Sequence, residues 1–262
     1  MSSYKKIKEV KCIYCSSLIP VNLPSCLICK LYFPKTNVII NNINLKDIYI
    51  INLEKDSKRL LRFRQFLKYY NISLQKRNWN RFNAIDGYDL KLIHDTCKLM
   101  TDKNIIPIWK KHKGSIGCYL SHLKLWIKLK EEKQNYSLIM EDDAYFIKNG
   151  LNNLEIVLNQ SLKYNWDILY IGNNIISGKK IHPLFVRPDY INRRGYNSGF
   201  FGYIINHKSI DKLLQIFSRF DSPFIDVQAR MLFRDFNALF VKGNLIKHYD
   251  SKSSRKVRDY NK

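Results

Sequence analysis

Short apolar runs recur along most of the chain, and segments with apolar residues at helical spacing separate them. Runs of this length, bounded by polar or turn-forming residues, are typical of buried strands. The expected strands cover residues 48–53, 80–85, 138–140, 167–171, 199–205 and 239–241. Strands that alternate with helices predict an α/β fold with a mostly parallel sheet.

Four segments between these runs have one apolar face at a period of 3.6 residues. The first follows Ser57, the clearest begins at Ser115 and ends near 130–133, a third follows residue 205, and the last begins at Asp226. In the segment that begins at Ser115, the apolar stripe is Ile116, Leu120, Leu123 and Ile127. Each of the four is expected to cover the sheet as a helix.

Composition agrees with a folded protein and adds a strong positive charge. The 262 residues are 45% hydrophobic, and 45 Lys and Arg against 22 Asp and Glu give a net charge of +23. Such a charge attracts anions, including nucleic acid, anionic membranes and phosphate-bearing substrates. The charges are spread along the whole chain, however, and an abundance of Lys, Asn, Ile and Tyr also fits a compositional bias of the genome.

No apolar run reaches the length of a membrane-spanning helix, which is about 20 residues. The basic N-terminus is not followed by the apolar stretch of a secretory signal. We therefore expect a cytoplasmic protein. The expected domains are a Cys-rich element at 1–40, a main α/β domain at 47–255 and a basic tail at 256–262.

Four of the six cysteines form two close pairs near the N-terminus. Cys12 and Cys15 make one Cys-x-x-Cys pair, and Cys26 and Cys29 make the second. Paired thiolates at this spacing suit a tetrahedral structural Zn²⁺, which would stabilise an element too small for its own core. Disulfides or ordinary thiols are the alternatives, although disulfides require an oxidising compartment.

Three consecutive carboxylates, Glu141, Asp142 and Asp143, follow the apolar run 138–140. Two such charges 4 Å apart repel by roughly 1 kcal/mol in water and about 4 kcal/mol at an intermediate dielectric. A divalent cation would remove this cost. Alternate residues of a strand share a face, so Glu141 and Asp143 can converge on Mn²⁺ or Mg²⁺ while Asp142 points away. A solvated acidic turn is the alternative.

Several motifs, in order and with short gaps, resemble glycosyltransferase family 25. This family includes bacterial lipooligosaccharide galactosyltransferases and procollagen galactosyltransferases. The resemblance runs from about Ile48 to Arg255, and the first 40 residues lie outside it. The matching segments are 50–59 (IINLEKDSKR), 81–87 (RFNAIDG), 114–126 (GSIGCYLSHLKLW), 138–144 (LIMEDDA), 167–172 (DILYIG) and 223–226 (PFID).

The resemblance implies a GT-A-like nucleotide-binding sandwich and an inverting transfer of a hexose, galactose or glucose, from a UDP-sugar. The acceptor would be a hydroxyl of a glycan, as in lipopolysaccharide, or of hydroxylysine in a collagen-like protein. The acidic triplet then corresponds to the family's metal motif. Asp143, helped by Glu141, would hold Mn²⁺ or Mg²⁺ against the donor diphosphate, and Asp142 would act in catalysis or contact the ribose.

Further site residues are expected on both sides of this motif. His248 is a candidate metal ligand, with an ordinary surface histidine as the alternative. Asp226 is the candidate base, with helix capping as the alternative. The expected donor-binding residues are Asn52, Arg59, Asp86, Ser121 and His122, although Arg59 could be a solvated helix residue, Asp86 a turn residue and His122 a core residue.

The positive charge and the N-terminal cysteine pairs also fit a different class of function. The chain could be a zinc-containing nucleic-acid-binding protein on a degenerate transferase scaffold. A third possibility is a zinc module at residues 1–40 that docks a partner and is fused to an active transferase.

Overall fold

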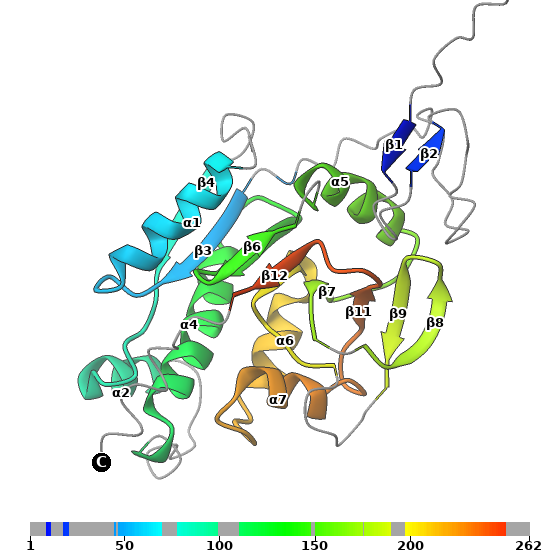
Figure 1. Ribbon diagram of the computed structural model, residues 1–262. Helices are drawn as coiled ribbons and strands as arrows, with labels where there is room; N and C mark the ends of the chain where they lie inside the picture. The colour runs from blue at the N-terminus through cyan, green and yellow to red at the C-terminus, as the bar shows by residue number, and fades with distance from the viewer. Residues whose placement is uncertain are drawn as a thin grey trace, which may run out of the picture.

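The computed structural model describes residues 9–11, 18–20, 45, 47–69, 78–98, 110–147, 150–174, 176–189 and 197–249. Its main feature is an eight-stranded sheet with helices on both faces (Figure 1). The strand order is β4-β3-β5-β10-β7-β11-β9-β8. The strands are β3 (Asp47–Asn52), β4 (Asn78–Asn83), β5 (Tyr136–Glu141), β7 (Ile168–Gly172), β8 (Gly178–His182), β9 (Phe185–Pro188), β10 (Gly202–Asn206) and β11 (Ala238–Val241).

Strand direction follows the sequence prediction in most of the sheet. β3 pairs in parallel with β4 and β5, and β7 pairs in parallel with β11. β10 lies between β5 and β7 and is antiparallel to both, and β9 is antiparallel to β11 and β8. Six of the eight strands therefore point the same way, and β9 and the central β10 are reversed.

Helices cover the sheet as the apolar periodicity predicts. The helices that match expected segments are α1 (Ser57–Tyr69), α4 (Lys113–Lys130), α6 (Ile210–Phe217) and α7 (Ile225–Met231). Helices α2 (Leu90–Lys98) and α5 (Gly150–Ser161) were not predicted, and a 3-10 turn, η2 (His207–Ser209), precedes α6. α4 begins two residues before the expected Ser115, with His112 as its N-cap.

Two separate cores fill the space between the sheet and its helices. Tyr49 and Ile51 of β3 pack into the core beneath α4 and α6, whereas Ile48 and Ile50 pack into the core beneath α1 and α5. Alternate residues of one strand thus enter different cores, as the pleat of a strand requires. This three-layer arrangement confirms the α/β sandwich.

Directly after the acidic triplet, β6 (Ala144–Phe146) pairs antiparallel with β12 (Ile246–His248), and the two form a separate two-stranded sheet. The register places His248 opposite Ala144. The expected strand 199–205 starts later, at Gly202, and Gly199 has a φ angle of 114°, which is incompatible with a strand.

In the element expected at 1–40, two short strands, β1 (Glu9–Lys11) and β2 (Leu18–Pro20), pair antiparallel. Cys12, Cys15, Cys26 and Cys29 lie outside the described residues, as does the tail at 256–262. The structural zinc site and the domain boundaries therefore stay predictions. Among the helices that the structure describes, none is long and apolar enough to cross a membrane.

Candidate active site

The acidic triplet lies at the carboxyl end of β5, at the centre of the sheet. Glu141 is the last residue of β5 and pairs with Ile51 of the parallel neighbour β3. The next residue of β3, Asn52, ends that strand at the same edge. In α/β sheets, ligands bind beyond the carboxyl ends of the strands. The parallel pairing therefore brings Asn52 and the triplet together at a ligand-binding edge.

Asp142 is the most deeply buried carboxylate of the triplet, with 5% of its surface exposed. Its Oδ2 accepts a hydrogen bond from Asn52 Nδ2 at 2.7 Å, and its Oδ1 lies 2.7 Å from Arg59 Nη2. Burial raises the pKa of Asp142 to about 7, although the Arg59 charge and the Asn52 hydrogen bond oppose this rise. Asp142 is therefore poised to titrate near neutral pH.

Arg59 holds two members of the triplet at once. The same Nη2 atom that contacts Asp142 also donates to Asp143 Oδ2 at 2.8 Å. The sequence predicted that a divalent cation would relieve the repulsion in the triplet. In this structure the Arg59 guanidinium neutralises part of that charge, which the sequence alone does not indicate.

Asn52 is oriented by a residue that the sequence analysis missed. Arg81 Nε donates to Asn52 Oδ1 at 3.0 Å, which leaves the Asn52 amide nitrogen to face Asp142. Asn52, Arg59 and Asp142 thus form one connected polar group. The prediction that Asn52 and Arg59 contact the donor remains open.

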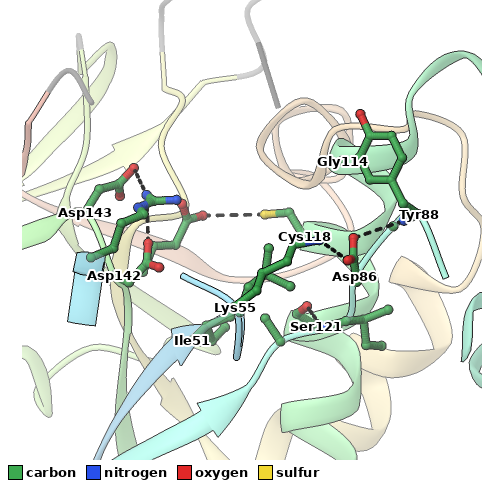
Figure 2. A pocket seen from close by; sticks show the side chains of 15 residues that line it. Ile51, Lys55, Asp86, Tyr88, Gly114, Cys118, Ser121, Asp142 and Asp143 are labelled. Carbon is green, nitrogen blue, oxygen red and sulfur yellow. Dashed lines mark hydrogen bonds and ion pairs between the residues drawn. The ribbon is translucent and has the colours of Figure 1, made fainter. Parts of the chain in front are cut away.

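A pocket opens above this group, bounded by the triplet on one side and by the loop after β4 on the other. Figure 2 shows Asp142 and Asp143 at one end, Asp86 and Tyr88 at the other, and Cys118 between them. Asp86 accepts a hydrogen bond from the Tyr88 backbone N–H at 3.1 Å and forms an ion pair with Lys55. Asp86 therefore shapes a turn and also lines the pocket. Lys55 was not among the predicted site residues.

Ser121 and His122 have different positions although they are neighbours on α4. Ser121 lines the pocket, and its hydroxyl accepts from the Ile85 N–H at 2.8 Å and donates to the Gly117 carbonyl at 2.6 Å. His122 is fully buried, and its Nδ1 lies 2.9 Å from Tyr203 Oη. These contacts give Ser121 a clear role in joining α4 to the β4 loop, and they place His122 in the core behind the pocket.

A second pocket adjoins the first and shares Cys118, Glu141 and Asp143 with it. The predicted residues Asp226 and His248 both line this second pocket. Aromatic side chains that the sequence analysis missed complete its wall: Phe200, Phe201 and Phe224. The fold thus brings together candidate residues that lie more than 100 positions apart in the sequence.

The positions of Asp226 and His248 follow from local structure. Asp226 is the second residue of α7, whose N-cap is Phe224, and its Oδ1 accepts a hydrogen bond from the Val227 N–H at 2.9 Å, so Asp226 both stabilises the helix start and lines the second pocket. His248 reaches the site because β12 pairs with β6, and the next residue, Tyr249, donates its N–H to the Asp143 carbonyl at 3.1 Å.

Two carboxylates and a histidine line the second pocket, although their ligand atoms do not all lie within 4.8 Å of one another in this structure. Glu141 and Asp143 offer carboxylate oxygens and His248 offers an imidazole nitrogen, and all three line the second pocket. Oxygen ligands with one imidazole fit Mn²⁺ or Mg²⁺.

Comparison with known proteins gives consistent results. The profile of "Glycosyltransferase family 25 (LPS biosynthesis protein)" matches residues 45–228. A glycosyltransferase 25 family member of Anopheles gambiae is 27% identical over 180 residues, covering 67% of this chain and 29% of that protein. Procollagen galactosyltransferase 1 of Danio rerio is 31% identical over 106 residues, covering 39% of this chain and 17% of that protein. The chain thus spans less than a third of the length of these relatives.

Among solved structures, a glycosyltransferase involved in the glycosylation of the major capsid of PBCV-1 aligns with 81% of this chain and 96% of its own. Its TM-score is 0.43 and its sequence identity is 10%, so this likeness adds nothing to the assignment. The profile covers more than half of the sequence and includes α4, the acidic triplet and Asp226. The chain therefore belongs to glycosyltransferase family 25.

Proposed function

We propose that this protein transfers a hexose from a UDP-sugar to an acceptor hydroxyl, with inversion at the anomeric carbon and dependence on Mn²⁺ or Mg²⁺. The observation that carries the proposal is the pair of adjoining pockets that share Glu141 and Asp143. Two substrates can enter from two sides and meet at these carboxylates. A single-substrate binding protein has no need of this arrangement.

The first pocket is the proposed donor side. Arg59, Lys55 and Asp86 line it together with Asp142. Arg59 and Lys55 offer positive charge to a diphosphate. Asn52 donates a hydrogen bond to Asp142 and so fixes the position of that carboxylate. A divalent ion held by Glu141, Asp143 and His248 would neutralise the charge that develops on the leaving UDP. Ser121 and His122 would shape this side from α4.

The second pocket is the proposed acceptor side, with Asp226 as base. Asp226 takes the proton from the acceptor hydroxyl, and the hydroxyl oxygen forms the new bond to the anomeric carbon. The bond between that carbon and the diphosphate oxygen breaks, and UDP leaves with the electron pair. The aromatic wall formed by Phe200, Phe201 and Phe224 offers flat apolar surface against which a sugar ring can pack.

The class of substrate is proposed from the relatives. The family description names lipopolysaccharide biosynthesis, and one relative is named as a procollagen galactosyltransferase. Galactose or glucose is the proposed sugar. A hydroxyl of a glycan and a hydroxyl of hydroxylysine are both candidate acceptors.

A donor screen tests the proposal. The purified protein is incubated with Mn²⁺ and each of several UDP-sugars, and UDP release and the melting temperature are followed. We expect one UDP-hexose to raise the melting temperature and to be slowly hydrolysed. No response to any sugar nucleotide, with or without metal, would exclude the proposed donor site.

Two variants separate the roles of the two pockets. Asp143→Ala should abolish both activity and the metal-dependent shift in melting temperature, because it removes a ligand oxygen. Asp226→Asn should keep that shift but reduce transfer by about 100-fold or more, as expected for loss of a general base. If Asp143→Ala retains both activity and the metal-dependent shift, Asp143 has no part in metal binding or in the reaction.

A further inference from the structure

We propose that Cys118, His122 and Glu141 form a binding site for a thiophilic divalent ion of the zinc class, which shares Glu141 with the proposed Mn²⁺ site but takes its other ligands from α4. Cys118 and His122 lie one turn apart on α4, so both side chains project from the same face of the helix. Glu141 approaches that face from the end of β5. One ligand atom of each residue (the Cys118 Sγ, a His122 ring nitrogen and a Glu141 carboxylate oxygen) lies within 4.8 Å of the other two.

The separations match those of ligands around one zinc ion. The Cys118 Sγ to Glu141 Oε1 distance is 3.7 Å, and the His122 Nε2 to Glu141 Oε1 distance is 3.5 Å. Zinc bond lengths and tetrahedral angles put sulfur and oxygen ligands about 3.5 Å apart, and nitrogen and oxygen ligands about 3.3 Å apart. The two distances that involve Glu141 are therefore within about 0.2 Å of those around one zinc ion, and Cys118 Sγ lies within 4.8 Å of the His122 ligand atom.

The buried histidine provides an independent reason to expect a ligand. His122 is 0% exposed, and within the described part of the chain its Nε2 atom has no hydrogen-bond partner. A buried polar atom without a partner costs roughly 1–3 kcal/mol. A metal ion between Nε2, Glu141 and Cys118 would remove that cost.

The other ring nitrogen of His122 has the support that metal-bound histidines usually have. Nδ1 lies 2.9 Å from Tyr203 Oη, and Trp126 Nε1 donates to the same oxygen at 2.9 Å. The hydroxyl oxygen has two lone pairs and can accept from both rings. In that state the Nδ1 proton points to Tyr203 and the Nε2 lone pair points to Glu141, as metal binding through Nε2 requires.

The choice of ion follows from the ligands. A thiolate and an imidazole with one carboxylate favour Zn²⁺ over Mg²⁺ or Mn²⁺, which prefer oxygen. On binding, the Cys118 thiol releases its proton to solvent and a sulfur–zinc bond forms. Cys118 and Glu141 both line the adjoining pockets, so a fourth coordination position can face the cavity.

Site-resolved alkylation tests the site on the full chain. The protein is stripped of metal, incubated with Zn²⁺ or with Mg²⁺, and treated with N-ethylmaleimide, and the reaction rate of each cysteine is read by peptide mass spectrometry. We expect Zn²⁺ to slow the reaction of Cys118 by roughly tenfold or more, since a metal-bound thiolate is not free to react. Mg²⁺ should give no protection.

Cys97 on α2 is the matched control, because it is also half-buried and lies outside the cluster. Its rate should not respond to Zn²⁺, and it also reports whether each variant is folded. Glu141→Gln keeps the size of the side chain but loses the charge, and it should remove the protection of Cys118. Tyr203→Phe should weaken zinc binding roughly 10- to 100-fold through loss of the His122 partner.

Co²⁺ offers a second measurement that does not depend on the reactivity of Cys118. The thiolate-to-cobalt absorption of the native chain should exceed that of Cys118→Ser, whatever the N-terminal cysteines contribute to both. Equal absorption, or protection of Cys118 that persists in Glu141→Gln, would overturn the site. Neither readout requires sugar transfer, so the outcome is independent of the donor screen.

Discussion

Asp142 differs from its two acidic neighbours in how little water reaches it. Glu141 and Asp143 line both pockets, whereas Asp142 lines only the first and rests on Asn52 and Arg59. Desolvation penalises the charged carboxylate, and a single guanidinium shared with Asp143 does not fully compensate. The result is a carboxyl that holds its proton to much higher pH than an exposed aspartate does.

This difference predicts a pH dependence of stability in metal-free protein. In the unfolded chain Asp142 loses its proton near its ordinary pKa of 3.8, and in the folded chain burial raises that pKa to about 7. Between these values the folded state holds more protons, so rising pH favours unfolding. The contribution of Asp142 to stability is complete below about pH 4 and is lost as pH rises through 7, by on the order of 2–4 kcal/mol.

Asp142→Asn should remove that loss. Urea unfolding in the presence of a chelator, at pH 5 and at pH 8, gives the free energy of unfolding of both proteins. As pH rises, the free energy of unfolding of Asp142→Asn should increase relative to that of the native chain. Asp211→Asn is the control, because the Asp211 side chain is 73% exposed, and it should not change the slope. An identical slope in the native chain and Asp142→Asn would show that Asp142 titrates normally.

At the scale of elements, α4 is fixed against the loop after β4 by close backbone contact. A Cβ on Gly117 would lie 2.6 Å from the Gly87 nitrogen and 2.7 Å from the Ile85 carbonyl oxygen. Ser121, one turn further along, joins the same loop through the Ile85 N–H. Because Asp86 and Gly87 line the first pocket, the packing of α4 sets the shape of the proposed donor side.

Gly117→Ala should therefore destabilise the protein, although the same change in an ordinary helix stabilises it by up to about 1 kcal/mol. Backbone atoms cannot move aside as a flexible side chain can. We expect a loss on the order of 1–3 kcal/mol and weaker donor binding. Thermal unfolding measures the first and donor-induced stabilisation the second. Lys124→Ala, on the exposed face of α4, should change neither.

The elements themselves could be predicted largely from the sequence. Fully buried strands such as β3 and β7 are continuous apolar runs, and α4 has a clear apolar stripe, so local pattern was sufficient. β6 and β12 are only three residues long, and each forms because the other is present. Local pattern carries no signal for such a pair.

The site could be predicted only in part. Glu141, Asp143, Asp226 and His248 were predicted from motifs and resemblance, and all four line the second pocket. Lys55 and Arg81 were missed because the chain has 45 lysines and arginines, and nothing in the sequence marks which ones pair with a site residue. The contact between Asn52 and Asp142 joins residues 90 positions apart, so it depends on strand order.

At the scale of the whole molecule, the two pockets are built from different parts of the chain. The first is lined only by residues between 51 and 143, whereas the second also draws on residues 174, 199–201, 224–226 and 248. Cys118, Glu141 and Asp143 belong to both. Donor and acceptor binding should therefore respond to different substitutions.

Phe224→Ala tests this separation. Phe224 lines the second pocket, is 37% exposed, and its ring lies 5.2 Å from that of His112. Loss of the apolar area that Phe224 offers to the sugar should cost on the order of 1 kcal/mol, which corresponds to a roughly 5-fold rise in the KM for the acceptor. The stabilisation by the UDP-sugar should not change. Steady-state transfer kinetics with the acceptor found to support activity measure the KM, and donor thermal shifts measure the stabilisation by the UDP-sugar.

Met231→Ala is the control and should affect neither quantity. Met231 is exposed at the end of α7, the helix whose N-cap is Phe224, and it does not line the second pocket. A change in donor binding, or an equal effect of the two variants, would mean that the two pockets do not divide the substrates between them.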